Sequence, residues 1–249
     1  MYQFGEKHPV IMEIILLVIS FMAAAAVVVA GSVVGMHSDL SSSIGRVIAG
    51  AGLYFVYRRA FEGNRLFGNP VYLIPALLFA AWNVFYNLSS GKWFGGPYYY
   101  LEALVTAIAP AVYEEVLFRG IFIYNLKKKG HGALVCMLIS AAVFALVHLT
   151  NIAGQAAADV ALQAGYSFVV GLVFAAVYLK NNSLLEIVFA HFMIDFTNRI
   201  FNEQAASASM AQIAVFAALL AGEAVWAIRM GKRIEGHSTP EGHSTPEVE

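Results

Sequence analysis

Ionisable side chains interrupt three apolar stretches of this chain, at spacings that suit chemistry between helices. The stretches read AVYEEVLFRG at 111–120, FALVH at 144–148 and HFMID at 191–195. Their ionisable residues are Glu114, Glu115, Arg119, His148, His191 and Asp195. An ionisable group inside lipid costs about 2.5–3.5 kcal/mol on insertion scales, so it persists mainly where it is paired or functional. We therefore treat these residues as candidates for chemistry.

Spacing assigns these groups to helix faces. Glu115 and Arg119 lie four positions apart, so they share one face and can form an ion pair that lowers the cost of burying both. Glu114 points about 100° away from Glu115 and has no such partner on its own helix. His191 and Asp195 are again four positions apart, which brings an imidazole and a carboxyl group to one face.

The chemistry that these residue types allow is hydrolysis. A carboxylate in a low-dielectric pocket can serve as a general base or acid near neutral pH. Two imidazoles can hold a water molecule, donate to an oxyanion or bind a metal. No serine or cysteine stands at comparable spacing to a histidine, so we expect water to attack a carbonyl. Cys136 lies in an apolar run and is expected to be a small buried residue rather than a nucleophile.

Structural roles are the alternative for each motif taken alone. For Glu115 and Arg119 a structural ion pair is the favoured interpretation. His148 could be a packing residue, and His191 with Asp195 could form a hydrogen-bonded contact between helices. The joint presence of two carboxylates and two imidazoles on separate helices favours a functional cavity.

Composition indicates a membrane protein. The 249 residues are 59% hydrophobic and only 12% charged, whereas soluble domains have about 25% charged residues. The formal net charge is −1, and nucleic-acid binding needs a concentrated basic face, so we expect no nucleic-acid partner.

The apolar runs predict an all-α, polytopic integral membrane protein with about eight transmembrane helices, and seven or nine are the alternatives. A polar cavity is expected between spans four, five and seven. Glu186 in span seven and Glu223 in span eight are further ionisable residues, while Glu13 and Glu102 lie close enough to span ends to be solvated. The eight ranges are 10–30, 41–57, 70–88, 98–124, 133–149, 158–179, 183–200 and 209–230.

Basic residues predict the orientation, because cytoplasmic loops collect lysine and arginine. They follow spans two, four, six and eight, which places both termini in the cytoplasm. Only Lys92 and Arg199 lie near loops of the other side. The basic residues are Arg58, Arg59, Arg65, Lys127, Lys128, Lys129, Lys180, Arg229, Lys232 and Arg233.

The C-terminal end differs from the rest of the chain. The sequence EGHSTP occurs twice in residues 235–249, and this polar composition predicts a disordered tail. Residues 1–234 are expected to form one transmembrane domain whose motifs lie within 98–200.

The three motifs resemble those of a known family. EEVLFRG at 114–120, FALVH at 144–148 and HFMID at 191–195 are similar to the EExxxR, FxxxH and HxxxN/D motifs of the CPBP family. These proteins are the CAAX-type intramembrane glutamate endopeptidases, also called the Abi family. The resemblance covers about residues 98–200 and implies an all-helical membrane protease that uses no cofactor or metal.

The resemblance also implies a role for each matching residue. Glu114 would be the general base, with His148 helping to hold the water. His191 and Asp195 would stabilise the oxyanion. Asp195 stands where the family's prenyl-protein proteases carry Asn, and an ionised Asp cannot donate to an oxyanion, so it must be protonated or must orient the His191 ring. Glu115 and Arg119 would organise the base, and Phe144 supports the second motif.

The resemblance leaves the substrate and other functions open. Eukaryotic members trim prenylated proteins, whereas bacterial members are linked to bacteriocin or signal-peptide maturation and to self-immunity. The compact chain resembles a bacterial member of the family, which indicates the bacterial cell membrane. We expect a membrane-associated protein or peptide substrate, and the sequence leaves open whether that substrate is prenylated. The alternatives are a membrane immunity or scaffold protein or a transporter, and a zinc-dependent membrane protease. The sequence does not predict an oligomeric state.

Overall fold

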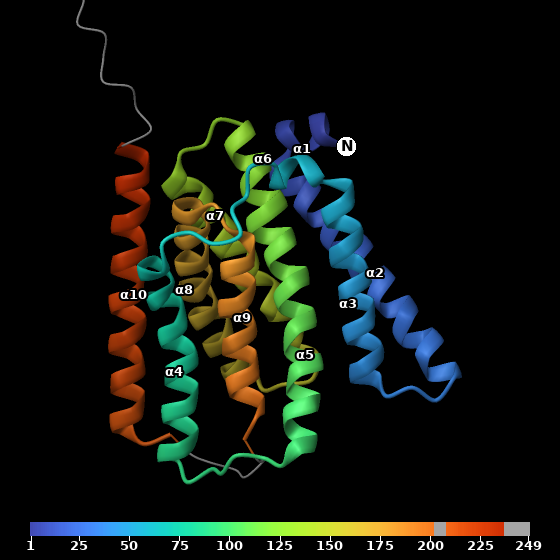
Figure 1. The fold of residues 1–249 in the computed structure, drawn as a ribbon, viewed down its shortest axis with the longest axis vertical. Coiled ribbons are helices and arrows are strands. Elements are labelled where there is room, and N and C mark those ends of the chain that lie inside the picture. The colour runs from blue at the N-terminus through green and yellow to red at the C-terminus, as the bar shows by residue number, and fades with distance from the viewer. Residues whose placement is uncertain (202–207, 237–249) are drawn as a thin grey trace, which may run out of the picture.

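Helices form the whole architecture. The structure, a computed structural model, describes residues 1–201 and 208–236, and within these ranges the chain forms no β-sheet. Figure 1 shows the long helices side by side in a bundle, with α2 and α3 splayed away from the rest at one end. The helices are α1 (Tyr2–Lys7), α2 (Pro9–Val33), α3 (Ser38–Val56), η1 (Arg58–Phe61), η2 (Pro70–Leu73), α4 (Ile74–Ser89), α5 (Pro97–Glu115), η3 (Val116–Phe122), α6 (Ile123–Lys128), α7 (Ala133–Val147), η4 (His148–Ala153), α8 (Ala157–Asn181), α9 (Leu184–Arg199) and α10 (Met210–Gly236).

The predicted all-α membrane fold is confirmed, and each of the eight predicted ranges is occupied mainly by helix. Within the described residues, five helices are long and apolar enough to cross a membrane: Pro9–Val33, Pro70–Ser89, Ala133–Ala153, Ala157–Asn181 and Met210–Gly236. The helices α3, α5 and α9 are shorter than these five helices or carry more ionisable residues than they do. Eight crossings therefore stay a prediction.

The apolar outer surface fits a lipid environment. Val29 and Val33 of α2 expose 65% and 82% of their surface, and Phe55 of α3 exposes 73%. Large exposed apolar areas mark contacts with a membrane or with other proteins. Together with the apolar length of the helices, they support an integral membrane protein.

The helices run alternately up and down the bundle. The C-terminal ends of α3, α6, α8 and α10 lie at the end that also holds the N-terminus (Figure 1). The four basic clusters therefore lie at one end of the bundle, as their spacing predicts. That this end is cytoplasmic stays a prediction.

Helix α8 forms the centre of the bundle. All residues from Val170 to Tyr178 are buried. Gly171 lies against α7, where a Cβ atom would come within 3.0 Å of the Ala141 Cα. This close approach between backbones brings the carbonyl of Gly171 next to the buried side chain of Arg119.

A π-helical segment follows Glu115. The segment η3 (Val116–Phe122) is entirely buried and continues into α6, while Pro110 lies one turn earlier, inside α5. Ser140 of α7 donates its hydroxyl to the Phe118 carbonyl at 3.0 Å. A π turn releases backbone carbonyls from the regular pattern and is frequent at functional sites.

The turn between α8 and α9 is fixed by polar contacts. Ser183 caps α9 by accepting the Glu186 backbone N–H. The Glu186 carboxylate accepts hydrogen bonds from the Gly68 N–H at 2.8 Å and from Asn181 Nδ2 at 2.7 Å. Glu186 therefore holds the loop before α4 against this turn, and it does not line the cavity described below.

The last helix extends slightly into the region predicted as a tail. α10 ends at Gly236, and the Glu235 carboxylate accepts the Leu134 N–H at 2.9 Å. The rest of that region, residues 237–249, lies outside the described residues, so the predicted disorder stays a prediction.

Candidate active site

Side chains from α2, α3, α5, α7, α8 and α9 enclose a cavity of about 270 Å³ in the bundle. All four residues predicted as catalytic line it, namely Glu114, His148, His191 and Asp195, as does the supporting residue Phe144. They come from α5, the junction of α7 with η4, and α9, so helix packing brings together residues far apart in the chain.

Glu115 and Arg119 form a buried ion pair beside this cavity. Arg119 Nη1 donates to Glu115 Oε1 at 2.8 Å, and both side chains have no solvent exposure. Arg119 Nη2 lies 3.5 Å from the Gly171 carbonyl of α8. The four-residue spacing predicted this pair, because such residues share a helix face.

Aromatic rings surround the guanidinium. The Arg119 Cζ atom lies 4.4 Å from the ring centroid of Phe144 and 5.4 Å from that of Phe174. A cation over an aromatic face is attracted by the ring quadrupole, and the attraction grows when water is excluded. Phe144, the supporting residue of the second motif, therefore contributes to holding Arg119.

His191 joins α9 to the ion pair. Its Nδ1 atom lies 2.7 Å from Glu115 Oε1, the oxygen that also accepts from Arg119. The paired carboxylate can only accept, so Nδ1–H is the donor. Its Nε2 atom therefore faces the other way, toward the cavity. Glu115 thus fixes the His191 ring through Nδ1, and the role of Asp195 stays a proposal.

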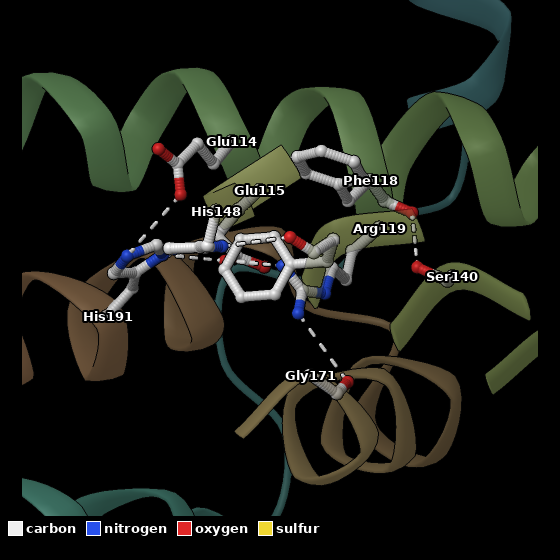
Figure 2. A network of polar contacts seen from close by, with 9 residues as sticks. Glu114, Glu115, Phe118, Arg119, Ser140, His148, Gly171 and His191 are labelled. Carbon is white, nitrogen blue, oxygen red and sulfur yellow. Dashed lines mark hydrogen bonds and ion pairs between the residues drawn. The ribbon is translucent and has the colours of Figure 1, made fainter. Parts of the chain in front are cut away.

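Glu114 points at His191 from the opposite side of the ring, as Figure 2 shows. Its Oε2 atom lies 3.8 Å from His191 Nε2, and its side chain is 22% exposed, whereas that of Glu115 is fully buried. Two adjacent carboxylates thus have different environments. Glu115 is held by two partners, while Glu114 remains accessible from the cavity.

His148 is oriented by its own helix. Its Nδ1 atom donates to the Phe144 carbonyl at 2.9 Å, and the two rings meet edge to face with centroids 4.8 Å apart. In a neutral imidazole the Nε2 atom is then an acceptor. The side chain lines the cavity in this orientation.

Three charged residues near the site were not identified as functional from the sequence: Arg46 and Arg199, which line the cavity, and Glu13. Arg46 of α3 lines the cavity. Its charge inside the apolar range 41–57 is a signal in the sequence that could have identified it. Glu13 of α2 is fully buried and within electrostatic range of Arg119. The expectation that Glu13 is solvated at a span end is therefore wrong, because its side chain faces the core near Tyr57 and Arg119.

Two other expectations concern metal ligands and Cys136. Among the described residues, no group of three or more His, Cys, Asp and Glu side chains has a geometry that could hold a metal ion. Cys136 is free and buried, as predicted.

Comparisons with known proteins support the motif assignment. Residues 96–197 match the family model described as Type II CAAX prenyl endopeptidase Rce1-like. No curated protein and no solved structure matches the chain. The matched segment includes all three motifs but neither Glu13 nor Arg46.

Proposed function

Residues 96–197 belong to the CPBP family as an Rce1-like CAAX protease domain, and from this premise we propose that the chain hydrolyses peptide bonds within the membrane. The resemblance predicted from the three motifs is thereby confirmed. The family supports a peptidase with a peptide or protein substrate in the membrane. The residue roles below are our proposal.

Glu114 acts as the general base in this proposal. It takes a proton from a water molecule in the cavity, and the water oxygen attacks the carbonyl carbon of the substrate. His148 accepts a hydrogen bond from the same water through Nε2, because its Nδ1–H is already bound to the Phe144 carbonyl. Glu114 then passes its proton to the leaving amine nitrogen, so no proton is gained or lost.

His191 stabilises the oxyanion that forms on the carbonyl oxygen. It carries protons on both nitrogens: Nδ1–H donates to Glu115, and Nε2–H donates to the oxyanion. The carboxylates of Glu115 and Glu114 together balance the charges of this imidazolium and of Arg119. Asp195 lines the same cavity and adds a second donor in its protonated form.

One observation carries this proposal: an accessible carboxylate faces an imidazole that a buried ion pair holds in position. The Glu114–His191 separation of 3.8 Å leaves the two groups close enough to act on one substrate carbonyl. Hydrogen bonds in a free site are often long and shorten when the substrate binds.

The test compares membrane peptides from cells that express wild type or Glu114→Gln. We expect fragments that appear only with wild type, because glutamine cannot accept the proton. Glu102→Gln is the matched control, since Glu102 lies on the same helix and does not line the cavity. Equal fragments with wild type and Glu114→Gln would remove the proposed base.

The same variants address the alternatives. An immunity, scaffold or transport role predicts that Glu114→Gln still protects the cell or supports its partner. A zinc-dependent protease predicts stoichiometric zinc in the purified protein, with activity lost to a chelator and restored by zinc. The substrate is expected to be a membrane-associated protein or peptide.

A further inference from the structure

Arg46 brings a positive charge into the cavity from outside the matched segment. The side chain is half-buried and lines the cavity together with Glu114 and His191. Within the described residues it makes no hydrogen bond, ion pair or contact with an aromatic face. A guanidinium inside an apolar helix is costly, and such groups persist where they are paired or bind a ligand.

The backbone around Arg46 is held tightly. At Gly45 a Cβ atom would come within 2.8 Å of the Ala24 Cα of α2, and at Gly50 within 3.1 Å of the Tyr113 Cα of α5. Helix α3 is therefore packed closely against its neighbours on both sides of Arg46. The backbone at Arg46 is thus held in place beside the cavity.

Three polar groups that line the cavity with Arg46 contact groups other than its guanidinium. The Ser20 and Tyr113 hydroxyls hydrogen-bond to each other. Glu114, the nearest catalytic carboxylate on α5, faces His191. The five donors of the guanidinium thus remain available, and their planar arrangement matches the two oxygens of a carboxylate.

We propose that Arg46 binds a carboxylate of the peptide substrate and so fixes the peptide relative to Glu114. The proposal rests on the proposed function for the statement that the ligand is a peptide. Gly50 packs on Tyr113, and Arg46 lies one helix turn, about 6 Å, from Gly50. The carboxylate is therefore bound about one turn of α3 from the level of Tyr113 and its neighbour Glu114, the proposed base. It is either the C-terminal carboxylate or the side chain of an Asp or Glu.

A binding measurement tests the proposal without requiring cleavage. The probes are short dansylated peptides of mixed apolar sequence in three sets: one ends in a free carboxylate, one in an amide, and one in an amide with a single internal Glu. Each set is titrated onto the full chain carrying Glu114→Gln, in phosphatidylcholine nanodiscs, with dansyl fluorescence as the readout.

We expect one of the two carboxylate sets to bind roughly 10- to 100-fold more tightly than the plain amide set, the range that a charge-assisted hydrogen bond gives. The set that does so identifies the source of the carboxylate. Arg46→Gln should remove the difference and Arg46→Lys should keep part of it. Arg58→Gln is the matched control, because Arg58 follows the same helix and is exposed outside the cavity.

Equal affinity of the three sets for protein with Arg46 intact would overturn the proposal, even if Arg46→Gln does not fold. A preference that survives Arg46→Gln would overturn it as well. So would a preference that only Arg199→Gln removes, because Arg199 also lines the cavity. Failure of the proposed function would be a different result. In that case the peptidome would not depend on Glu114, while the carboxylate preference could still be measured.

Discussion

At the residue scale, one oxygen atom organises the site. Glu115 Oε1 accepts from both Arg119 and His191, while Glu115 Oε2 has no hydrogen-bond partner among the described residues. The carboxylate therefore satisfies a buried cation and orients an imidazole at the same time. Its neighbour Glu114 does not pair with Arg119 and meets His191 only on the other side of the ring, at 3.8 Å, so it is left for chemistry in the proposed function.

This difference predicts opposite results for the same substitution at adjacent positions. Glu115→Gln leaves the Arg119 guanidinium buried without a counter-charge, and breaking a buried pair in this way costs about 3–5 kcal/mol. Glu114→Gln should change thermal stability in detergent very little and abolish cleavage. Similar melting temperatures for the two variants would contradict the proposed division of roles.

His148 gives a second prediction at this scale. In the proposed function, His148→Ala removes the Nε2 acceptor for the attacking water, so we expect a loss of about 100-fold or more in the turnover number. Stability should fall only modestly, because the side chain is half-buried. Activity assays on protein that remains monodisperse in detergent would check this, and wild-type turnover would exclude the role.

The sequence predicted residues of the site where the interaction is local. The Glu115–Arg119 pair follows from spacing alone. The contact between Glu115 and His191 joins residues 76 positions apart, so it depends on how α9 packs and not on any local pattern. Arg46 and Glu13 belong to helices without a recognised motif, and only the fold shows that they lie near the site.

At the element scale, the helices were predictable and the irregular segment was not. Hydrophobic runs and their breaks identify helices because apolar faces must be covered by protein or lipid. The π-helix at 116–122 differs from an α-helix by a small change in backbone register. It depends on tertiary contacts such as the bond from Ser140 to the Phe118 carbonyl.

The close contact of α7 with α8 provides an element-scale prediction. Gly171→Ala places a methyl group 3.0 Å from the Ala141 Cα and 3.4 Å from Arg119 Nη2, and the backbone atom cannot move freely. We expect a loss of about 1–3 kcal/mol in stability together with reduced activity.

The matched control is Gly165→Ala on the same helix, where a Cβ atom meets nothing within 4 Å. This change should be neutral or stabilising by up to about 1 kcal/mol, since alanine favours helix more than glycine does. Thermal unfolding in detergent compares the two variants. Equal changes in melting temperature for the two variants would show that the close contact at Gly171 does not determine how α7 and α8 pack.

At the scale of the whole molecule, charge distribution predicts orientation. Glu62 follows α3 at the basic end of the bundle, and Ser38 begins α3 at the other end. In a Cys136→Ala background, an impermeant maleimide should label Ser38→Cys in intact cells. It should label Glu62→Cys only in inverted vesicles. The reverse pattern would place the basic end outside.

The residues that line the cavity come from two separate parts of the chain. The hairpin of α2 and α3 contributes Arg46 and one side of the cavity, while the three motifs lie within 96–197. In the proposed function, the reacting groups lie within 96–197, whereas the proposed carboxylate contact of Arg46 lies outside this segment. A substitution of Arg46 is therefore expected to change which peptides bind, while Glu114 and His191 keep their positions.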